Sequence, residues 1–221
     1  NFFLIFHIFK QKILVREHKE DLYLIILALI FILLIYFNNN SGFITVINIL
    51  SSLSNSGLSL DGIENNLSLY FLLITCIGGS LISNSSGIKL IRFYILIKTT
   101  SIEIIKLISP NSIVNKNIYS NGKKISNDNI NISFLIFISF FLSIFILSSI
   151  LIVDDINFEN SFKLSILTIT NTTISAMYGI ENINFSNLLT TSKLSLIIFM
   201  IIGKIELISI FLIIKKIFLK D

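Results

Sequence analysis

Long apolar runs alternate with short polar segments along the chain, and the runs fall into two classes of length. Residues 130–153 and 188–219 exceed the roughly 20 apolar residues that a helix needs to cross a membrane, and 22–37 comes close to that length. Residues 43–54 and 161–170 are shorter, and a helix over 43–54 would cover only about 18 Å. The pattern predicts an all-α membrane protein in which full spans alternate with re-entrant half-helices.

A short polar segment occurs twice, once after each predicted half-helix. Residues 52–59 read SLSNSGLS and residues 168–175 read TITNTTIS, so small hydroxyl, aliphatic and Asn residues recur in the same order. The sequence GIEN follows both copies, at 62–65 and at 179–182. A repeat with a period of about 116 residues indicates two copies of one structural unit. We therefore expect two helix–pore-loop–helix repeats.

The two repeated segments are predicted to be ion-filter loops. A short helix that ends near the membrane centre directs the negative end of its dipole there, which favours a cation. Gly57 gives the main chain freedom to turn carbonyls toward a pore, and such carbonyls replace the hydration shell of an ion in selectivity filters. A surface turn between two spans is the alternative, and the repetition favours the filter. The predicted filter residues are Ser54, Asn55, Ser56, Gly57, Leu58, Thr170, Asn171, Thr172, Thr173 and Ile174.

The apolar run 67–108 is too long for one span and contains a small, polar interruption. Its interrupting residues include Gly78, Gly79, Ser83, Asn84, Ser85, Ser86 and Gly87. Polar, glycine-rich breaks at membrane depth are tolerated only beside a cavity. The break therefore predicts an intramembrane loop beneath the filter that acts as a gate, and a kinked helix with water-satisfied carbonyls is the alternative.

These runs divide the chain into four segments. Residues 1–21 are expected to be the end of a preceding membrane helix and a charged linker, 22–110 the first repeat, 111–129 a cytoplasmic loop and 130–221 the second repeat. The chain begins at Asn1 without an initiator Met, so we expect it to be the C-terminal part of a longer protein.

Basic residues are concentrated in segments that alternate with segments lacking them. Residues 10–19 carry four Lys or Arg and 89–124 carry seven, whereas 38–66 carry none. Cytoplasmic loops retain basic residues, so the chain is predicted to loop outside at 38–66 and 153–187 and to end in the cytoplasm. A nucleic-acid interface in 89–124 is the rival interpretation, but beside apolar spans membrane topology explains the charges better, and no nucleic-acid partner is expected.

The remaining chemistry argues against an enzyme. The chain is 53% hydrophobic, and it contains no nucleophile motif, metal-ligand cluster or phosphate-binding loop, so we expect no cofactor besides a transported ion. Cys76 is interpreted as a small buried apolar residue. Lys204 and Glu206 lie near the middle of the last apolar run, where charges are costly and usually face a pore or a partner.

Three stretches resemble the Trk/Ktr/HKT superfamily of cation transporters, in particular its bacterial TrkH-type potassium-uptake subunits. Residues 77–92, IGGSLISNSSGIKLIR, resemble that family's Gly-Gly, Ser-Thr-Ala-Gly-Gly and Ile-Lys-x-Ile-Arg segment. Residues 108–114 resemble its His-Pro-x-Ala-Val stretch, and GKIE at 203–206 resembles its Gly-Arg-Leu-Glu motif.

The resemblance implies a fold, a function and partners. The family has four helix–pore-loop–helix repeats around one pore, and this chain would carry the third and fourth. It implies potassium uptake across the bacterial cytoplasmic (inner) membrane, with lipid around the protein, usually a homodimer, and a nucleotide-binding regulatory subunit on the cytoplasmic face. By the same resemblance Lys204 would lie below the filter, in the position of the family's Arg.

One departure from the family pattern leaves alternatives open. The family's fourth filter glycine falls on Thr173, whose β-branch resists unusual main-chain angles and whose hydroxyl could offer a side-chain oxygen. Two glycines of the family's intramembrane loop are Ile82 and Ser86 here, which would stiffen a gate. A sodium-permeable or weakly selective transporter is therefore one alternative, and a non-conducting membrane subunit or decayed paralogue is another.

Overall fold

Helices make up most of the described chain. In the computed structural model the described residues are 19–36, 42–60, 67–80, 83, 85–109, 119–120, 123–180, 183 and 185–205. The helices are α3 (Lys19–Tyr36), α4 (Gly42–Leu53), α5 (Ser68–Cys76), α6 (Leu90–Ile108), α7 (Asn127–Ile152), α8 (Phe158–Ile169) and α9 (Thr190–Ile205). Single 3-10 turns, η2 (Ala176–Tyr178) and η3 (Phe185–Asn187), follow α8. One short antiparallel strand pair, β3 (Tyr119–Ser120) and β4 (Lys123–Lys124), lies between α6 and α7.

The helices lie where the apolar runs predict them, with shifts of a few residues at their ends. α8 begins at Phe158, earlier than the expected Ser161, with Asn157 as its N-cap residue. α9 is described as far as Ile205. The rest of that predicted span, with Glu206, lies outside the described residues, as does Asn84.

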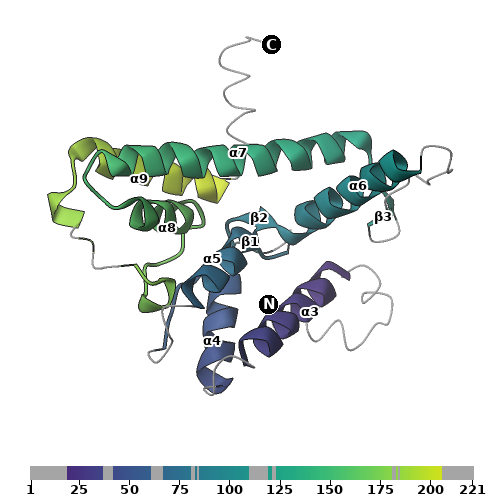
Figure 1. Cartoon of the computed structure of the whole chain (residues 1–221), viewed down its shortest axis with the longest axis horizontal. Helices are drawn as coiled ribbons and strands as arrows, with labels where there is room; N and C mark the ends of the chain where they lie inside the picture. Colours follow the sequence, from purple (N-terminus) through teal and green to yellow (C-terminus); the bar gives the residue numbers. More distant parts are fainter. Residues whose placement is uncertain are drawn as a thin grey trace, which may run out of the picture.

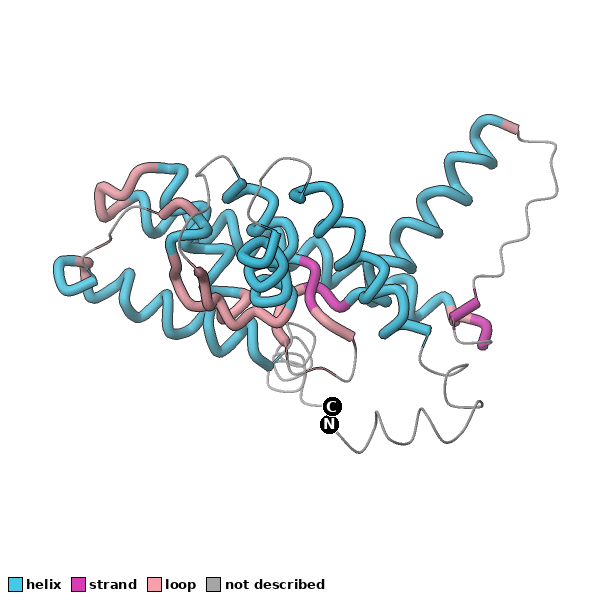
Figure 2. The backbone as a smooth tube through the Cα atoms, turned by 90° about the horizontal axis from the view of Figure 1, so that it is seen from below, coloured by secondary structure: helices cyan, strands magenta, loops and turns pink. Residues whose placement is uncertain are grey.

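The described helices form two groups that share a core. α7 lies along one side with α8 and α9 packed on it, while α3, α4 and α5 form the second group (Figure 1). α5 contacts both α8 and η2, and this contact joins the two groups. α6 packs against α7, and its far end extends away from the rest of the molecule (Figure 2).

The buried face of α7 mixes serines with apolar residues, and its exposed face is apolar. Four of its buried residues are serines whose hydroxyls donate to main-chain carbonyls three or four residues earlier: Ser133, Ser139, Ser143 and Ser148. Ile138, Leu142 and Phe145 are each more than half exposed. Soluble monomers rarely expose large apolar patches, whereas small residues at helix contacts are typical of membrane proteins.

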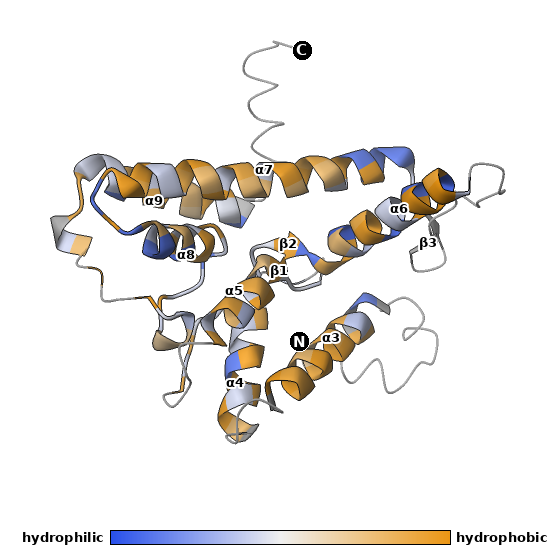
Figure 3. Cartoon of the chain, in the orientation of Figure 1, coloured by the Kyte–Doolittle hydropathy of each residue, from blue (hydrophilic) through white to orange (hydrophobic). Residues whose placement is uncertain are grey.

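The helices also differ in how apolar they are along their length. Figure 3 shows that α3 and α7 are apolar along most of their length. Among the described residues, α7 is the helix that is long and apolar enough to cross a membrane by itself, and shorter apolar helices cover Leu22–Ile35 and Phe43–Leu53.

α4 and α8 occupy the two short runs that were predicted to be half-helices. Each contains 12 residues, which corresponds to about 18 Å at 1.5 Å per residue. α4 ends at Leu53 and α8 ends at Ile169, so each stops where a copy of the repeated polar segment begins. We call residues 54–58 the first polar loop and residues 170–174 the second polar loop.

The run 67–108 is divided by a loop and not by a kink in one helix. Strand β1 (Ile77–Gly78) follows α5, strand β2 (Ile88–Lys89) precedes α6, and the two pair in parallel. The strands satisfy each other's main-chain groups on both sides of the break. We call residues 79–87, between the strands, the intramembrane loop, keeping the name of the prediction, although residues 81, 82 and 84 lie outside the described residues.

Candidate functional site

The two polar loops leave their half-helices with the same main-chain hydrogen bonds. In each loop three consecutive amides donate to carbonyls in the last turn of the preceding helix, at 2.9 to 3.2 Å. The pairs are Ser54 to Leu50, Asn55 to Ser52 and Ser56 to Ser51 in the first loop, and Thr170 to Ile166, Asn171 to Thr168 and Thr172 to Leu167 in the second. These bonds tighten the helix ends and occupy carbonyls that would otherwise lack partners.

The loops also share a turn of the main chain, but they differ at one position. Asn55 has a φ of 56° and Asn171 a φ of 52°, in the left-handed region that Asn tolerates better than most residues. Gly57 has a φ of +70°, whereas Thr173, at the matching position, is not among the described residues with positive φ. The second loop therefore accommodates a β-branched residue by keeping it out of the left-handed region.

The hydroxyl groups of each loop form one equivalent pair. Ser54 Oγ donates to Ser56 Oγ at 3.2 Å, and Thr170 Oγ1 lies 2.8 Å from Thr172 Oγ1 in the second loop. Thr170 Oγ1 also donates to the Ile166 carbonyl in the last turn of α8. Several hydroxyl groups of the loops thus form hydrogen bonds within the loop or to the last turn of the preceding helix, and these bonds stabilise the helix ends.

The two polar loops touch each other at Gly57 and Thr173. Thr173 Oγ1 donates a 2.7 Å hydrogen bond to the main-chain oxygen of Ser56. A Cβ atom on Gly57 would overlap the Thr173 side-chain and main-chain oxygens and would lie 2.7 Å from the Thr173 nitrogen. Gly57 is therefore required both by its positive φ and by the approach of the second loop.

The intramembrane loop is attached to both polar loops through Ser86, which is buried. Asn55 Nδ2 donates to the Ser86 main-chain oxygen at 2.9 Å, and Asn171 Nδ2 donates to Ser86 Oγ at 3.4 Å. Asn171 Nδ2 also donates to the Met200 carbonyl of α9 at 2.9 Å. Residues from both predicted filter loops and from the predicted gate therefore converge on one serine.

A serine cluster holds the intramembrane loop together. Ser85 Oγ accepts a hydrogen bond from the Gly79 amide at 2.8 Å and lies 2.7 Å from Ser83 Oγ. Ser83 Oγ in turn donates to the Ser80 carbonyl at 2.8 Å. Gly79 packs so tightly here that an added Cβ would overlap the Ser83 hydroxyl and lie 2.7 Å from the Ser85 hydroxyl oxygen. The predicted gate residues Gly78 and Gly87 form a second close contact, because a Cβ on Gly78 would lie 2.5 Å from the Ser86 main-chain oxygen and 3.2 Å from the Gly87 carbonyl carbon.

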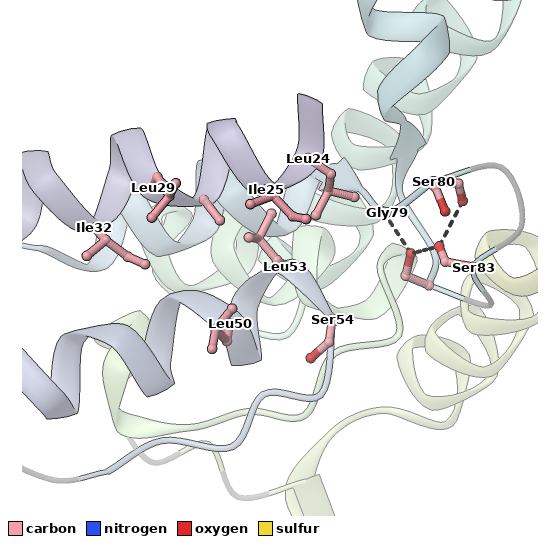
Figure 4. A pocket seen from close by; sticks show the side chains of 12 residues that line it. Leu24, Ile25, Leu29, Ile32, Leu50, Leu53, Ser54, Gly79, Ser80 and Ser83 are labelled. Carbon is pink, nitrogen blue, oxygen red and sulfur yellow. Dashed lines mark hydrogen bonds between the residues drawn. The ribbon is translucent and has the colours of Figure 1, made fainter. Parts of the chain in front are cut away.

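A cavity of about 570 Å³ lies between α3, the end of α4 and the intramembrane loop. Figure 4 shows Leu24, Ile25, Leu29 and Ile32 of α3 opposite Leu50 and Leu53 of α4. Ser54 lies at the end of α4, and the far end of the cavity is formed by Gly79, Ser80, Ser83 and Ser85 (Figure 4). The cavity thus has apolar walls and a polar end, which is the serine cluster.

Lys89 is a residue of this region that the sequence analysis did not single out. It was grouped there with basic residues of the cytoplasmic side, but the structure leaves only 5% of it exposed. Its ammonium donates to the main-chain oxygens of Ser83 at 2.7 Å and Ser85 at 2.6 Å. The signal available in the sequence was its place at the end of the polar break, between Ile88 and Leu90.

The other predicted residues lie at the edges of this arrangement. Leu58 and Ile174 are exposed, and so is Lys204 in the last turn of α9. Gly203, beside it, lies against the end of α8, because an added Cβ would overlap the Ile169 carbonyl oxygen. α9 can approach the second polar loop this closely only with glycine at 203.

A buried cation supports the far side of the second loop. Lys163 of α8 donates to the Gly179 carbonyl at 2.9 Å and pairs with Glu159, which is exposed in the first turn of α8. The hydrogen bond from Lys163, together with its positive charge, lowers the pKa of the Glu159 carboxyl below its ordinary value. The hydrogen bond from Lys163 to Gly179 fixes the segment after the second polar loop against α8.

Comparison with known proteins gives the fold. No family model matches the chain, and no curated protein matches its sequence. The structure is similar to the crystal structure of the potassium transporter TrkH from Vibrio parahaemolyticus, with a TM-score of 0.71 and 19% identity, over 86% of this chain and 42% of that one. The chain therefore spans about two-fifths of the TrkH chain that it matches. The similarity shows that the chain has an all-α membrane-transporter fold.

Proposed function

We propose that this chain forms part of a pore for uptake of monovalent cations, potassium in the first place. The observation that carries the proposal is the meeting of two equivalent polar loops at the ends of two half-helices, at Gly57 and Thr173. The TrkH-like fold supports it, since the solved neighbour is a potassium transporter. Residues 54–58 and 170–174 are the proposed filter loops of two repeats over 22–110 and 130–221.

The chemistry of the loops suits a cation. Both half-helices end at the loops, so the negative ends of two helix dipoles are directed at the same region. Many of the hydroxyl groups are engaged in holding the loop shape, which leaves main-chain oxygens as the groups able to replace water around an ion. In the proposed arrangement the intramembrane loop lies below the filter as the gate, and Lys204 lies near the same exit.

A sodium-permeable or weakly selective pore is the second candidate. It is favoured by Thr173, whose hydroxyl engages the Ser56 carbonyl where the first loop has a glycine. A pore in which one carbonyl is engaged by a hydroxyl replaces the hydration shell of potassium less completely. Measured influx of potassium and sodium under equal gradients separates this candidate from the first.

The deciding experiment is cation flux in lipid vesicles containing the complete natural polypeptide that includes these residues. We expect potassium influx in the wild type and none in Gly57→Val, because a branched side chain at φ +70° would displace the Thr173 loop. Leu142→Val, on the exposed face of α7, is the matched control and should conduct like the wild type. Undiminished flux in Gly57→Val would remove the filter assignment. Absence of flux in the wild type would favour a non-conducting membrane subunit.

Localisation and partners extend the proposal. A bacterial cytoplasmic membrane, a homodimer and a cytoplasmic nucleotide-binding subunit are what the family resemblance implies. Cross-linking in membranes, followed by mass determination with and without added nucleotide, tests the dimer and the regulator separately from transport.

A further inference from the structure

A second cavity, of about 380 Å³, lies between α5 and α8. Leu72 and Ile166, each 6% exposed, form its floor. Leu69 and Leu73, which also line it, are 62% and 51% exposed, so the cavity is open along one side. Its volume is within the range of small-molecule binding sites. We call it the α5–α8 groove.

Phe162 forms part of the α8 side of the groove and is held by two aromatic contacts. The centre of its ring lies 6.0 Å from that of Phe158, in a stacked arrangement, and 6.2 Å from that of Phe145 on α7. Such contacts favour a defined orientation of the ring. The apolar wall is therefore formed by the protein itself, and its chemistry suits a hydrocarbon chain.

Polar groups gather where the two helices begin. Ser68 is the first residue of α5, and Glu159 is the second residue of α8. Gly179 lies between the helices at this end, because an added Cβ would be 3.2 Å from Ser68 Cβ and 3.5 Å from Lys163 Nζ. The groove residues further along the two helices are Leu72, Leu73, Cys76 and Ile166. The groove thus has a polar end and an apolar end, as a lipid molecule has.

The charge exposed at the polar end is negative. The Lys163 side chain is only 11% exposed, and its ammonium donates to the Gly179 carbonyl and pairs with Glu159 Oε1. The Glu159 side chain is 76% exposed. The ammonium is therefore enclosed by the protein, whereas the carboxylate can accept a hydrogen bond from outside. An exposed carboxylate attracts an ammonium group and repels an anionic one.

We propose that the α5–α8 groove binds a membrane phospholipid whose headgroup ends in a primary ammonium, with one acyl chain along the apolar walls and the ammonium hydrogen-bonded to Glu159. A primary ammonium has three N–H donors, and its hydrogen bond to a carboxylate is charge-assisted. A quaternary ammonium has the same charge but no N–H to donate. The inference goes beyond the proposed transport function and does not depend on it.

The test uses photoactivatable phospholipids that share their acyl chains and differ only in the headgroup. They are phosphatidylethanolamine, phosphatidylcholine and phosphatidylglycerol, each added in trace amount to phosphatidylcholine vesicles containing the complete natural polypeptide. Mass spectrometry of the labelled peptides locates the acyl chain. Labelling at Ile138 and Leu142, on the exposed face of α7, reports the surrounding bilayer and serves as the internal reference.

We expect phosphatidylethanolamine to label the α5 and α8 peptides about three- to tenfold more than phosphatidylcholine, relative to α7, the effect of one net hydrogen bond. Glu159→Gln should lower this labelling to the phosphatidylcholine level, because the amide lacks the negative charge. Glu103→Gln is the matched control, since Glu103 pairs with Lys106 on α6, and it should leave the labelling unchanged.

Leu73→Trp tests the groove without changing its charges. Leu73 is half exposed, so the larger side chain is accommodated on the open side of the groove. We expect labelling of α8 by all three lipids to fall in this variant. If Glu159→Gln does not accumulate in membranes, Leu73→Trp and the comparison of headgroups in the wild type decide the proposal.

Three outcomes would overturn the proposal. Equal labelling of the groove by the three lipids would mean that Glu159 selects no headgroup. Stronger labelling by phosphatidylglycerol would make Lys163 the recognised charge. Labelling of α7 without labelling of α5 and α8 would show that another protein segment covers the groove. Flux enters none of these comparisons, so failure of the transport function would leave the lipid site standing.

Discussion

The hydroxyl of Thr173 donates a 2.7 Å hydrogen bond to the main-chain oxygen of Ser56, and this bond joins the two polar loops where their sequences differ. The first loop has Gly57 at the position of Thr173. A carbonyl that already accepts a hydrogen bond has less electron density to offer a dehydrated cation. A side-chain donor therefore engages the Ser56 carbonyl, which belongs to the proposed filter.

Removing this donor is expected to change ion preference. Thr173→Ala frees the Ser56 carbonyl, so we expect preference for potassium over sodium to rise about two- to tenfold, the effect of one net hydrogen bond. Thr173→Ser keeps the hydroxyl and should keep the wild-type ratio. The measurement is influx of the two ions under equal gradients. A shift of the same size in both variants would show that the methyl group, and not the hydroxyl, sets the ratio.

Asn55 is expected to couple the first polar loop to the intramembrane loop. Asn55→Gly tolerates the φ of 56° but loses the amide that donates to the Ser86 carbonyl. We expect a loss of about 1 kcal/mol of stability and faster hydrogen exchange in 85–89. Thermal unfolding and exchange of the same samples measure both effects.

Asn55→Ala separates the two contributions of this residue. Alanine also lacks the amide, and in addition it resists a positive φ, so its unfolding temperature should fall below that of Asn55→Gly. Equal stability of the two variants would contradict a strained loop. Unchanged exchange in both would mean that the hydrogen bond to Ser86 does not hold the intramembrane loop.

Much of the helical fold could be predicted from the sequence because span length and hydropathy are local properties. The runs that predict α3 and α7 need only enough apolar residues to cross a membrane. The ends of α4 and α8 could be predicted because the polar segment at which each of them ends occurs twice in the sequence. The similarity to a solved membrane transporter confirms the all-α fold, and the residues assigned to the filter remain a prediction.

The contacts that give the site its character could not be predicted, because they join residues far apart in sequence. Ser86 accepts hydrogen bonds from the side-chain amides of Asn55 and Asn171. Nothing near Ser86 in the sequence indicates either partner. Lys89 counted as one of several basic residues because burial depends on what packs around it. The Thr173 hydroxyl was expected to offer an oxygen to an ion. Instead it donates a hydrogen bond to the Ser56 main-chain oxygen, a contact that depends on how the two loops meet in the fold.

Gly203 is expected to fix the distance between α9 and the second polar loop. A Cβ at 203 would overlap the Ile169 oxygen and lie 2.8 Å from the Ile169 carbonyl carbon, so Gly203→Ala must displace α9. The shift stretches the bond from Asn171 to the Met200 carbonyl, and we expect a loss of about 1 to 3 kcal/mol in stability.

Ile201→Ala provides the control for this helix, because the Ile201 side chain is about half exposed and a smaller residue there meets no main-chain atom of α8. Thermal unfolding in the same detergent or lipid compares the two variants. If Gly203→Ala is as stable as Ile201→Ala, the close approach of α9 to α8 is wrong.

The serines on the buried face of α7 give the last prediction. Ser143 is buried against the other helices and donates to the Ser139 carbonyl, whereas the neighbouring Leu142 is 54% exposed. Ser143→Leu adds volume to a packed contact, so we expect a loss of about 1 to 3 kcal/mol in lipid, although the change makes the helix more apolar. Leu142→Ala removes apolar surface from the exposed face and should leave folding in lipid nearly unchanged, because no packed contact is lost there. The order of unfolding temperatures in lipid measures which face is packed. A stabilising Ser143→Leu would mean that this face of α7 contacts lipid and that the packing of α7 on α8 and α9 is wrong.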